Sequence, residues 1–307
     1  MPRRIFNGTK RRNKVKISAM AVILVTGSAG QLGNELRMAS KNYSGYEFIF
    51  MDIDTLDITD REAVDKTIKD TCPDWIINCV AYNFVDKAET DIQNAIKVNT
   101  TGPGNISEAI KGSDCKFIHV STDYVFDGSS TNPYNENSIT NPQSVYGRSK
   151  LDGEKKALQH PYTMIIRTAW LYSSFGNNFV KTILKNAKVK DSLRVVFDQT
   201  GTPTYAADLA EVILAIISKV VRNQLIFNAG IYHYSNEGVC SWYDFATEIV
   251  REANINCLIS PILSKEFQSA ARRPAYSVLD KTKIKETYGI EIPHWRSSML
   301  RCMKLLE

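Results

Sequence analysis

A short apolar run followed at once by spaced glycines constrains this 307-residue chain more than any other feature. Residues 22–25 read Val-Ile-Leu-Val, residues 26–33 read Thr-Gly-Ser-Ala-Gly-Gln-Leu-Gly, and a helical pattern follows. A strand, a glycine turn and a helix in this order are typical of a dinucleotide-binding unit. Gly27 is predicted to permit the tight turn, Gly30 to let the backbone approach a pyrophosphate, and Gly33 to let the helix pack closely. The phosphates would then lie at the helix N-terminus, where free N–H groups favour anions.

Apolar runs alternate with helical patterns through the first half of the chain. This rhythm predicts an α/β fold with a Rossmann-type, doubly wound parallel sheet. Strands are expected at residues 21–25, 48–51, 75–82, 117–120, 163–167, 193–196 and 225–228. Helices are expected at residues 31–39, 57–68, 91–98, 100–110, 179–187, 208–221 and 243–253, with a further helix opened by Tyr146.

The rhythm breaks after Trp170, and the remaining sequence is polar and interrupted by proline. We therefore expect a dinucleotide-binding domain over residues 20–170 and a smaller C-terminal substrate-binding lobe over residues 171–307. The strongly apolar segment within residues 205–230 is expected to pack back on the sheet of the first domain.

Acidic residues follow the second predicted strand. Asp52 and Asp54 lie about 20 residues past Gly33, where an acid binds the ribose hydroxyls of a dinucleotide. Since two acids lie close together, the choice between NADH and NADPH stays open. Asp57 begins an Asp-x-Thr-Asp pattern that suits either a helix N-cap or a contact with adenine.

Tyr146 and Lys150 are four residues apart and therefore share one face of a helix. A cation one turn from a phenol is expected to lower the pKa of the tyrosine, which can then exchange a proton with a carbonyl or an alcohol. Thr122 ends the neighbouring predicted strand, and its hydroxyl can stabilise an oxyanion as a hydride arrives. Together these side chains predict hydride transfer next to a nicotinamide.

The overall charge of +5 is misleading because seven basic residues and no acid lie in residues 1–19. Residues 20–307 carry a net charge of −2, which gives no case for nucleic-acid binding. The basic tail can be a targeting peptide, a nucleic-acid or membrane patch, or sequence upstream of the true start at Met20; we favour the last and expect disorder there. No apolar run approaches 18 residues, so no membrane span is expected.

The six cysteines show no metal-binding spacing and are expected to be reduced thiols in a cytoplasmic protein.

The motifs together resemble the extended short-chain dehydrogenase/reductase family over essentially all of residues 20–307. The segments that carry the resemblance are 26–33, 85–89, 98–99, 121–128, 146–154, 167–170, 176–180, 198–204, 273–279 and 293–296. Among members of this family the chain is most similar to enzymes acting on a sugar nucleotide. The resemblance implies NADPH, with NADH as the alternative, as the reductant for the C4 ketone of dTDP-4-dehydro-β-L-rhamnose.

The resemblance also implies roles for individual residues. Tyr146 would donate the proton, and Thr122 would contact the reacting oxygen. Lys150 would adjust the pKa of Tyr146 and bind the ribose of the cofactor. The implied cofactor contacts are Gly27, Gly30, Gln31, Leu32, Gly33, Asp57, Ile58, Ala81, Tyr82, Asn83, Asn99, Tyr146 and Lys150. The implied substrate contacts are Thr122, Asp123, Trp170, Asn178, Gln199 and Arg273, of which the last three would face the nucleotide diphosphate. A dTDP-sugar is the expected partner, and the chain would act as a monomer or homodimer.

Related dehydratases carry Asp-Glu after the threonine, whereas this chain has Asp123-Tyr124. The missing carboxylate favours reduction over water elimination. Another sugar-nucleotide reductase or an epimerase stays open, as does a non-catalytic regulatory protein on the same fold, although the intact Thr122, Tyr146 and Lys150 set favours an enzyme.

A Mg²⁺ ion is possible but is not the favoured interpretation. Glu35 matches a glutamate that holds Mg²⁺ in some members of the family, but the partner carboxylate is not clearly matched by Ala207 and Asp208. We therefore interpret Glu35 as a solvated acid near a helix N-terminus.

Overall fold

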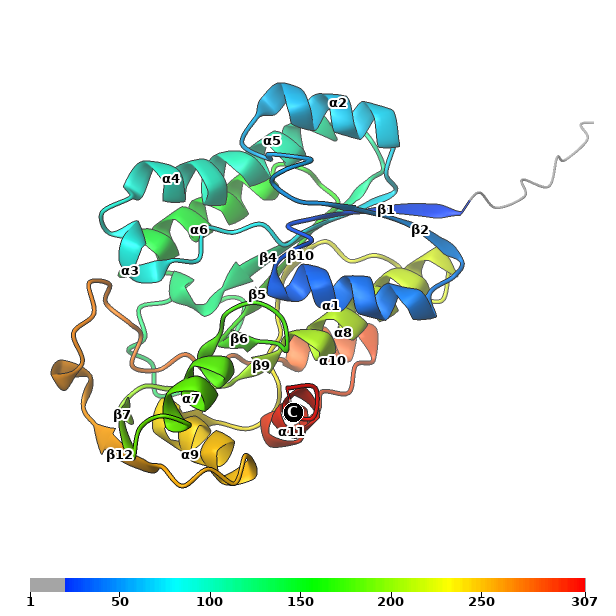
Figure 1. Ribbon diagram of the computed structural model, residues 1–307. Coiled ribbons are helices and arrows are strands. Elements are labelled where there is room, and N and C mark those ends of the chain that lie inside the picture. The colour runs from blue at the N-terminus through cyan, green and yellow to red at the C-terminus, as the bar shows by residue number, and fades with distance from the viewer. Residues whose placement is uncertain (1–19, 307) are drawn as a thin grey trace, which may run out of the picture.

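The computed structural model describes residues 20–306, so the expectations for residues 1–19 lie outside the described residues. A six-stranded parallel sheet runs through the centre of the molecule (Figure 1). Its strands are β1 (Ala21–Thr26), β2 (Tyr46–Met51), β3 (Trp75–Asn78), β4 (Lys116–Thr122), β5 (Thr163–Thr168) and β10 (Gly230–His233). Their order in space is β2-β1-β3-β4-β5-β10, which confirms the predicted doubly wound sheet.

Successive side chains of each strand enter two different cores, because they point to opposite faces of the sheet. Ile23 and Val25 pack with helices α1 (Gln31–Ala39), α8 (Ala206–Val221) and α10 (Thr282–Tyr288) on one face. Leu24 packs with helices α2 (Arg61–Thr71), α5 (Gly102–Ala109) and α6 (Val145–Ala157) on the other. Both faces are therefore covered, which explains the nearly continuous apolar character of the strands.

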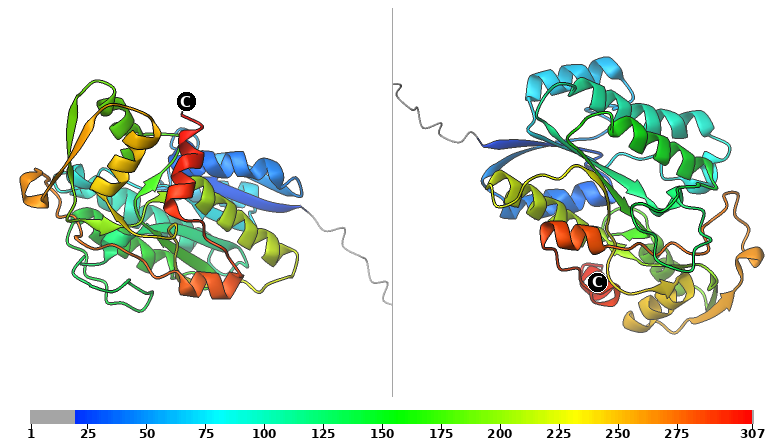
Figure 2. Two further views of the ribbon diagram at one scale, coloured as in Figure 1. Left: turned by 90° about the horizontal axis from the view of Figure 1, so that it is seen from below. Right: turned by 180° about the vertical axis from the view of Figure 1, so that it is seen from behind.

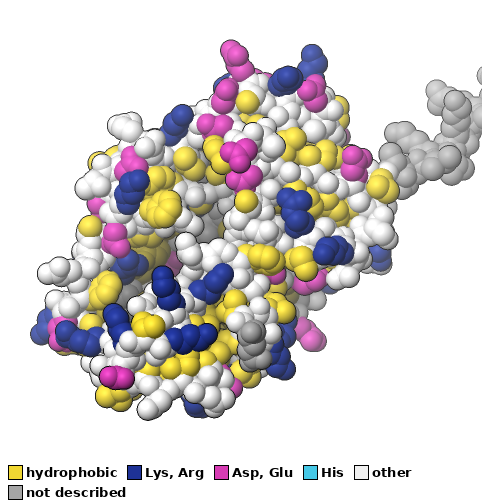
Figure 3. All heavy atoms as spheres, viewed as in Figure 1, with side chains coloured by type: hydrophobic (Ala, Val, Ile, Leu, Met, Phe, Trp, Pro, Cys, Tyr) yellow, Lys and Arg dark blue, Asp and Glu magenta, His cyan; other side chains and the backbone are white. Residues whose placement is uncertain are grey.

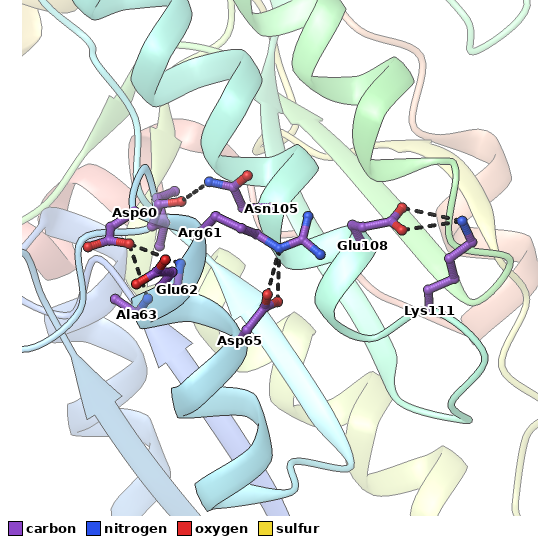
Figure 4. A network of polar contacts seen from close by, with 9 residues as sticks. Asp60, Arg61, Glu62, Ala63, Asp65, Asn105, Glu108 and Lys111 are labelled. Carbon is purple, nitrogen blue, oxygen red and sulfur yellow. Dashed lines mark hydrogen bonds and ion pairs between the residues drawn. The ribbon is translucent and has the colours of Figure 1, made fainter.

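The start of α2 is held by polar contacts that also connect it to α5 (Figure 4). Asp60 is the N-cap and accepts hydrogen bonds from the backbone N–H groups of Glu62 and Ala63. Asn105 of α5 donates to the carbonyl oxygen of Ile58 at 3.0 Å. Residues 57–59 are consequently a fixed loop before the helix, and the prediction that the helix starts at residue 57 is wrong.

The smaller lobe has its own core and lies next to the sheet domain (Figure 2). Its helices are α7 (Phe179–Ala187), α9 (Trp242–Glu252) and α11 (Trp295–Met303), and β7 (Ser192–Val196) pairs in parallel with β12 (Leu258–Ile262). The short strands are β6 (Leu171–Tyr172), β8 (Thr200–Gly201), β9 (Thr204–Tyr205) and β11 (Cys240–Ser241). Phe245 and Met299 are fully buried in this core.

Two predicted strands are wrong in part or entirely. β3 ends at Asn78, so residues 79–82 form a loop at the carboxyl edge of the sheet. The sixth strand is β10, not residues 225–228. Leu225 and Phe227 instead pack on the core without pairing, and the Phe227 ring meets Trp75 edge-on at 5.3 Å. Ile226 between them is exposed, so this apolar stretch packs on the core from one side only.

The helices around Asn99 are continuous, whereas a break was expected. α4 (Ile92–Ile96) runs through a π-helical turn, η2 (Lys97–Thr101), directly into α5. α3 (Val85–Ala88) precedes them as a single turn. All six cysteines are free thiols, and four of them are buried. None of the helices in residues 20–306 combines the length and the apolar character that crossing a membrane requires.

Gly33 should tolerate no side chain, because α1 packs directly on the preceding turn. A Cβ at this position would overlap the Gly27 carbonyl oxygen and lie 2.5 Å from the Cα of Ser28. We expect Gly33→Ala to lower the free energy of unfolding by about 1–3 kcal/mol in urea titrations. Gly45→Ala is the matched control, since a Cβ at Gly45 meets nothing within 4 Å. Equal stability of the two variants would contradict this packing.

Candidate active site

The turn between β1 and α1 forms one wall of the site. Gly27 has φ +71°, a conformation that favours glycine, and a Cβ there would lie 2.8 Å from the backbone nitrogen of Val80. α1 begins after Gly30, and no side chain among the described residues caps it. Its first-turn N–H groups are therefore available to an anion.

A cavity of about 550 Å³, which we call the active-site cavity, lies along the carboxyl edge of the sheet. The molecule is hollowed between the two parts of the chain, and Lys and Arg side chains gather on the lobe below (Figure 3). Fourteen of the predicted residues line the cavity: Gly27, Gly30, Gln31, Leu32, Asp57, Ile58, Ala81, Asn83, Thr122, Asp123, Tyr146, Lys150, Trp170 and Arg273. Asp52, which was considered for ribose binding, lines it as well.

Tyr82 and Asn99 do not line the active-site cavity. The side chain of Asn99 is fully buried, accepts from the backbone nitrogen of Tyr82 at 2.8 Å and donates to its carbonyl oxygen at 3.1 Å. The Tyr82 hydroxyl donates to Asp91. Asn99 therefore holds the loop that follows β3, and Gly33 likewise acts through packing.

Asn178 and Gln199 do not line the cavity, in contrast to the expected diphosphate contacts. Asn178 is the N-cap of α7: its Oδ1 accepts from the Lys181 N–H, and its Nδ2 donates to Gln31 Oε1 at 3.0 Å. Gln199 is buried and donates to Ser264 Oγ at 2.9 Å. Their polar atoms thus serve the fold around the cavity, and Asn178 positions Gln31, which does line it.

Thr122, Tyr146 and Lys150 meet at the end of β4 and the start of α6. Ser144 caps α6 by accepting from the backbone N–H of Gly147, which fixes the first turn that carries Tyr146. The Tyr146 ring packs edge-on against Tyr124 at 5.4 Å. Lys150 is 2% exposed, and its Nζ donates to the carbonyl oxygen of Val120 at 2.7 Å.

The expected lowering of the pKa of Tyr146 is wrong for this arrangement. Burial raises the pKa of Tyr146 above its ordinary value, and the charge of Asp123 adds to this, whereas a hydrogen bond with Thr122 acts the other way. Desolvation dominates because the Lys150 ammonium group donates to a carbonyl oxygen rather than to the phenol. Tyr146 is therefore a neutral phenol at physiological pH, which is the form that can donate a proton.

Burial changes the pKa of Lys150 in the opposite direction. Burial lowers the pKa of Lys150 to about 8, while Glu154 and Cys79 act to raise it. Lys150 is thus mainly charged at neutral pH and loses its charge as the pH rises through 8.

Asp123 presents an unpartnered acceptor at the site. Its Oδ1 accepts from the Thr122 hydroxyl at 2.9 Å, whereas Oδ2 is buried without a partner among the described residues. Burial raises the pKa of Asp123 to about 6, against the hydrogen bond from the Thr122 hydroxyl. An unpaired buried oxygen on a cavity wall suits a hydroxyl donor from a ligand.

Arg273 reaches the cavity from the C-terminal part of the chain. Its Nη2 lies 2.7 Å from Asp86 Oδ2, and its Nη1 lies 3.3 Å from the Tyr124 hydroxyl. Asp86 also accepts from the backbone N–H of Ala271 and the hydroxyl of Ser269. One carboxylate on α3 therefore holds the segment that carries Arg273 against the sheet domain.

Trp242 is a cavity residue that the sequence did not reveal. Its ring stacks on Trp170 with centroids 3.5 Å apart and planes 7° apart, and both line the cavity. Trp170 has φ +49°, an uncommon conformation for a bulky residue. No local pattern connects two tryptophans 72 positions apart, so only the fold brings them together.

Glu35 is not the solvated acid that was expected. Its side chain is 5% exposed and accepts from Ser173 Oγ at 2.6 Å, and burial raises its pKa. Asp208 is engaged by Asn236, Ser298 and Arg301. Within residues 20–306 no group of three or more His, Cys, Asp or Glu side chains is arranged to hold a metal ion.

Known sequences and structures include many proteins that are similar to this chain. A dTDP-4-dehydrorhamnose reductase of Aggregatibacter actinomycetemcomitans is 41% identical, over 91% of this chain and 97% of its own. The crystal structure of a dTDP-4-dehydrorhamnose reductase from Clostridium acetobutylicum has a TM-score of 0.87 and 42% identity, covering 93% of this chain and 99% of that one. That of the Bacillus anthracis enzyme in complex with NADP has the same TM-score and coverage at 35% identity.

The family described as RmlD substrate binding domain matches residues 20–307. This match covers the same residues as the motifs from which the relationship was predicted. The chain therefore belongs to the RmlD substrate binding domain family, together with these dTDP-4-dehydrorhamnose reductases.

Proposed function

We propose that the protein is an NAD(P)H-dependent oxidoreductase that reduces the C4 ketone of dTDP-4-dehydro-β-L-rhamnose to give dTDP-L-rhamnose. The observation that carries this proposal is the convergence of Thr122, Tyr146 and Lys150 with the glycine turn on one cavity. The relatives named dTDP-4-dehydrorhamnose reductase, which match this chain over nearly their full length, support the substrate.

The residues present fit a dinucleotide cofactor. The backbone at Gly27 and Gly33 leaves no room for a Cβ, which is the close approach such a turn requires, and the N-terminus of α1 is uncapped. The cofactor-contacting set on the cavity wall would be Gly27, Gly30, Gln31, Leu32, Asp57, Ile58, Ala81 and Asn83. When bound, a reduced nicotinamide supplies the hydride that C4 of the sugar receives.

Tyr146 donates the proton in this mechanism. As C4 gains a hydride, its oxygen becomes an alkoxide, and the Tyr146 hydroxyl transfers its proton to that oxygen. The phenolate left behind is stabilised by the Lys150 ammonium group one helical turn away, and solvent later restores the proton. A pKa of Tyr146 above its ordinary value suits this direction, because the donor holds its proton until the oxyanion forms.

Thr122 and Asp123 orient the sugar. The Thr122 hydroxyl can turn from Asp123 to the ketone oxygen and stabilise its developing charge. Asp123 Oδ2, which is buried and unpartnered, accepts from a sugar hydroxyl. Trp170 and Trp242 supply the apolar face for a 6-deoxyhexose.

Arg273 binds the diphosphate. Its guanidinium lines the cavity and is part-exposed, and its geometry suits two phosphate oxygens. The side chains of Asn178 and Gln199 instead make contacts that support the walls of the cavity.

Reduction is favoured over water elimination by the contacts of Tyr124. Elimination needs a carboxylate base beside Asp123, but Tyr124 occupies that place, packs on Tyr146 and hydrogen-bonds Arg273. A tyrosine whose pKa burial raises to about 12 provides no base there at neutral pH.

NADPH is the cofactor that we propose, with NADH as the alternative. Asp52 at the end of β2 accepts from the Ala29 N–H at 2.6 Å, so its charge faces the region of the ribose and disfavours a 2′-phosphate. Arg37 opposes this effect: its guanidinium lies 4.2 Å from the centre of the Phe50 ring and 3.3 Å from Ser28 Oγ. An arginine at this place can pair with a 2′-phosphate.

Turnover tests the function directly. Full-length protein mixed with NADPH and dTDP-4-dehydro-β-L-rhamnose should oxidise the cofactor, followed by absorbance, and yield dTDP-L-rhamnose by chromatography. Turnover with another keto-sugar nucleotide but none with this one would refute the substrate and retain the reductase class.

Tyr146→Phe should lower kcat by roughly 10²–10⁴-fold, because the ketone oxygen loses its proton donor. Cofactor affinity, measured by nicotinamide fluorescence, should change little. Tyr232→Phe is the matched control, since the Tyr232 hydroxyl bonds to the Asn228 carbonyl oxygen away from the cavity. Normal turnover by Tyr146→Phe would remove the proposed proton donor.

Asp52→Asn should raise the ratio of kcat/KM for NADPH to that for NADH by about tenfold, which corresponds to about 1.4 kcal/mol. Asparagine keeps an acceptor for the Ala29 N–H but removes the charge that repels a 2′-phosphate. Arg37→Gln should move the same ratio in the opposite direction. An unchanged ratio in both variants would place cofactor selection elsewhere.

A further inference from the structure

Helix α6 carries a third polar side chain in register with Tyr146 and Lys150. Glu154 lies one further turn along the same face, because the three residues are spaced by four. It is 1% exposed, and no role in the reaction follows from the mechanism above.

Three hydrogen bonds fix the Glu154 carboxylate. Oε1 accepts from the Ser121 hydroxyl at 2.5 Å and from Arg167 Nε at 2.9 Å, and Oε2 accepts from Arg167 Nη2 at 2.7 Å. The Glu154 and Arg167 side chains are each 2% exposed. A bidentate pair this deeply buried holds both charges at defined positions.

Two groups that face Lys150 from neighbouring elements are uncharged at neutral pH. Burial raises the pKa of Cys79, after β3, to about 12, and burial together with the charge of Lys150 lowers the pKa of His119 on β4. Tyr146 on α6 is a neutral phenol. Asp123 and Tyr124 act on Tyr146, and the Arg167 cation on β5 pairs with Glu154. Among these groups Glu154 is the anion that acts on Lys150.

We propose that Glu154 is a positioning residue for the reduction: its carboxylate, held by Arg167 and Ser121, keeps the buried Lys150 protonated and therefore able to hold the cofactor ribose and stabilise the phenolate. This inference rests on the proposed function, and it assigns a task to a residue outside the Thr122, Tyr146 and Lys150 set.

The physical reason is the cost of a buried ammonium group. Burial favours neutral Lys150, and the negative charge of Glu154 opposes that effect. Without the charge, the pKa of Lys150 falls below 8, so a larger fraction of Lys150 is neutral at physiological pH. The Arg167 guanidinium holds the Glu154 carboxylate in place through two hydrogen bonds.

Two substitutions at Glu154 separate charge from shape. Glu154→Gln keeps the length and loses the charge, and should move the alkaline limb of kcat/KM about one pH unit lower. Glu154→Asp keeps the charge, is shorter, and should leave the limb near its original pH although stability falls. A purely structural role predicts the reverse, because glutamine is the better replacement in shape. A limb that is unshifted in E154Q, or shifted equally in both variants, would overturn the proposal.

Arg167→Gln provides a second test, and it also serves if E154Q does not fold. Without the Arg167 cation, the buried Glu154 carboxylate loses its ion-pair partner, which favours the neutral acid and removes the charge that acts on Lys150. The alkaline limb of kcat/KM should therefore move to lower pH, as in E154Q, and an upward shift, or none, would contradict the proposal.

The affinity for NADPH as a function of pH, measured by nicotinamide fluorescence, gives a second readout without substrate. Because Lys150 holds the ribose, affinity should fall as Lys150 loses its proton, and this fall should begin at lower pH in E154Q. If the protein does not turn over the proposed substrate but the binding curve of E154Q is shifted to lower pH, only the substrate assignment is refuted. If the binding curve of E154Q is not shifted, the role of Glu154 is refuted.

Discussion

The contact between α1 and the turn that precedes it determines where the site can form. At Gly33 the helix backbone approaches Gly27 and Ser28 so closely that no side chain fits. This contact aims the uncapped N-terminus of α1 at the carboxyl edge of the sheet. The ends of β3 and β4 and the first turns of α6 border the same edge, so this backbone contact places the proposed phosphate site next to Tyr146, the proposed proton donor.

Features encoded over a few neighbouring residues could be predicted from the sequence. The glycine turn and the Tyr146–Lys150 spacing depend on local geometry, and alternating strands and helices imply a sheet covered on both faces. The carboxyl ends of parallel strands meet at one edge, so most candidate residues were expected near one another. Thr122 and Asp123 follow from that rule because Thr122 ends β4 and Asp123 begins the turn after it.

Features that depend on tertiary contacts could not be predicted in this way. Trp242 contacts Trp170 only because the fold places α9 next to the cavity. Asn178 has a side chain that could bind a ligand, but it caps α7. The pKa of Tyr146 illustrates the same limit in energetic terms: the spacing to Lys150 indicates an attraction, whereas burial of both groups decides the direction. Spacing identifies neighbours but does not measure how much water they lose.

The π-helical turn η2 has a consequence for the evolution of this helix pair. A π-helical turn contains one residue more than an α-helical turn. Each residue of an α-helix rotates the chain by about 100° around the helix axis. Deleting one residue from 97–101 would leave a regular helix but rotate Asn99 away from the Tyr82 backbone that it holds. Sequence length in this stretch is therefore constrained by a single asparagine side chain, even where the identities of its neighbours are free to change.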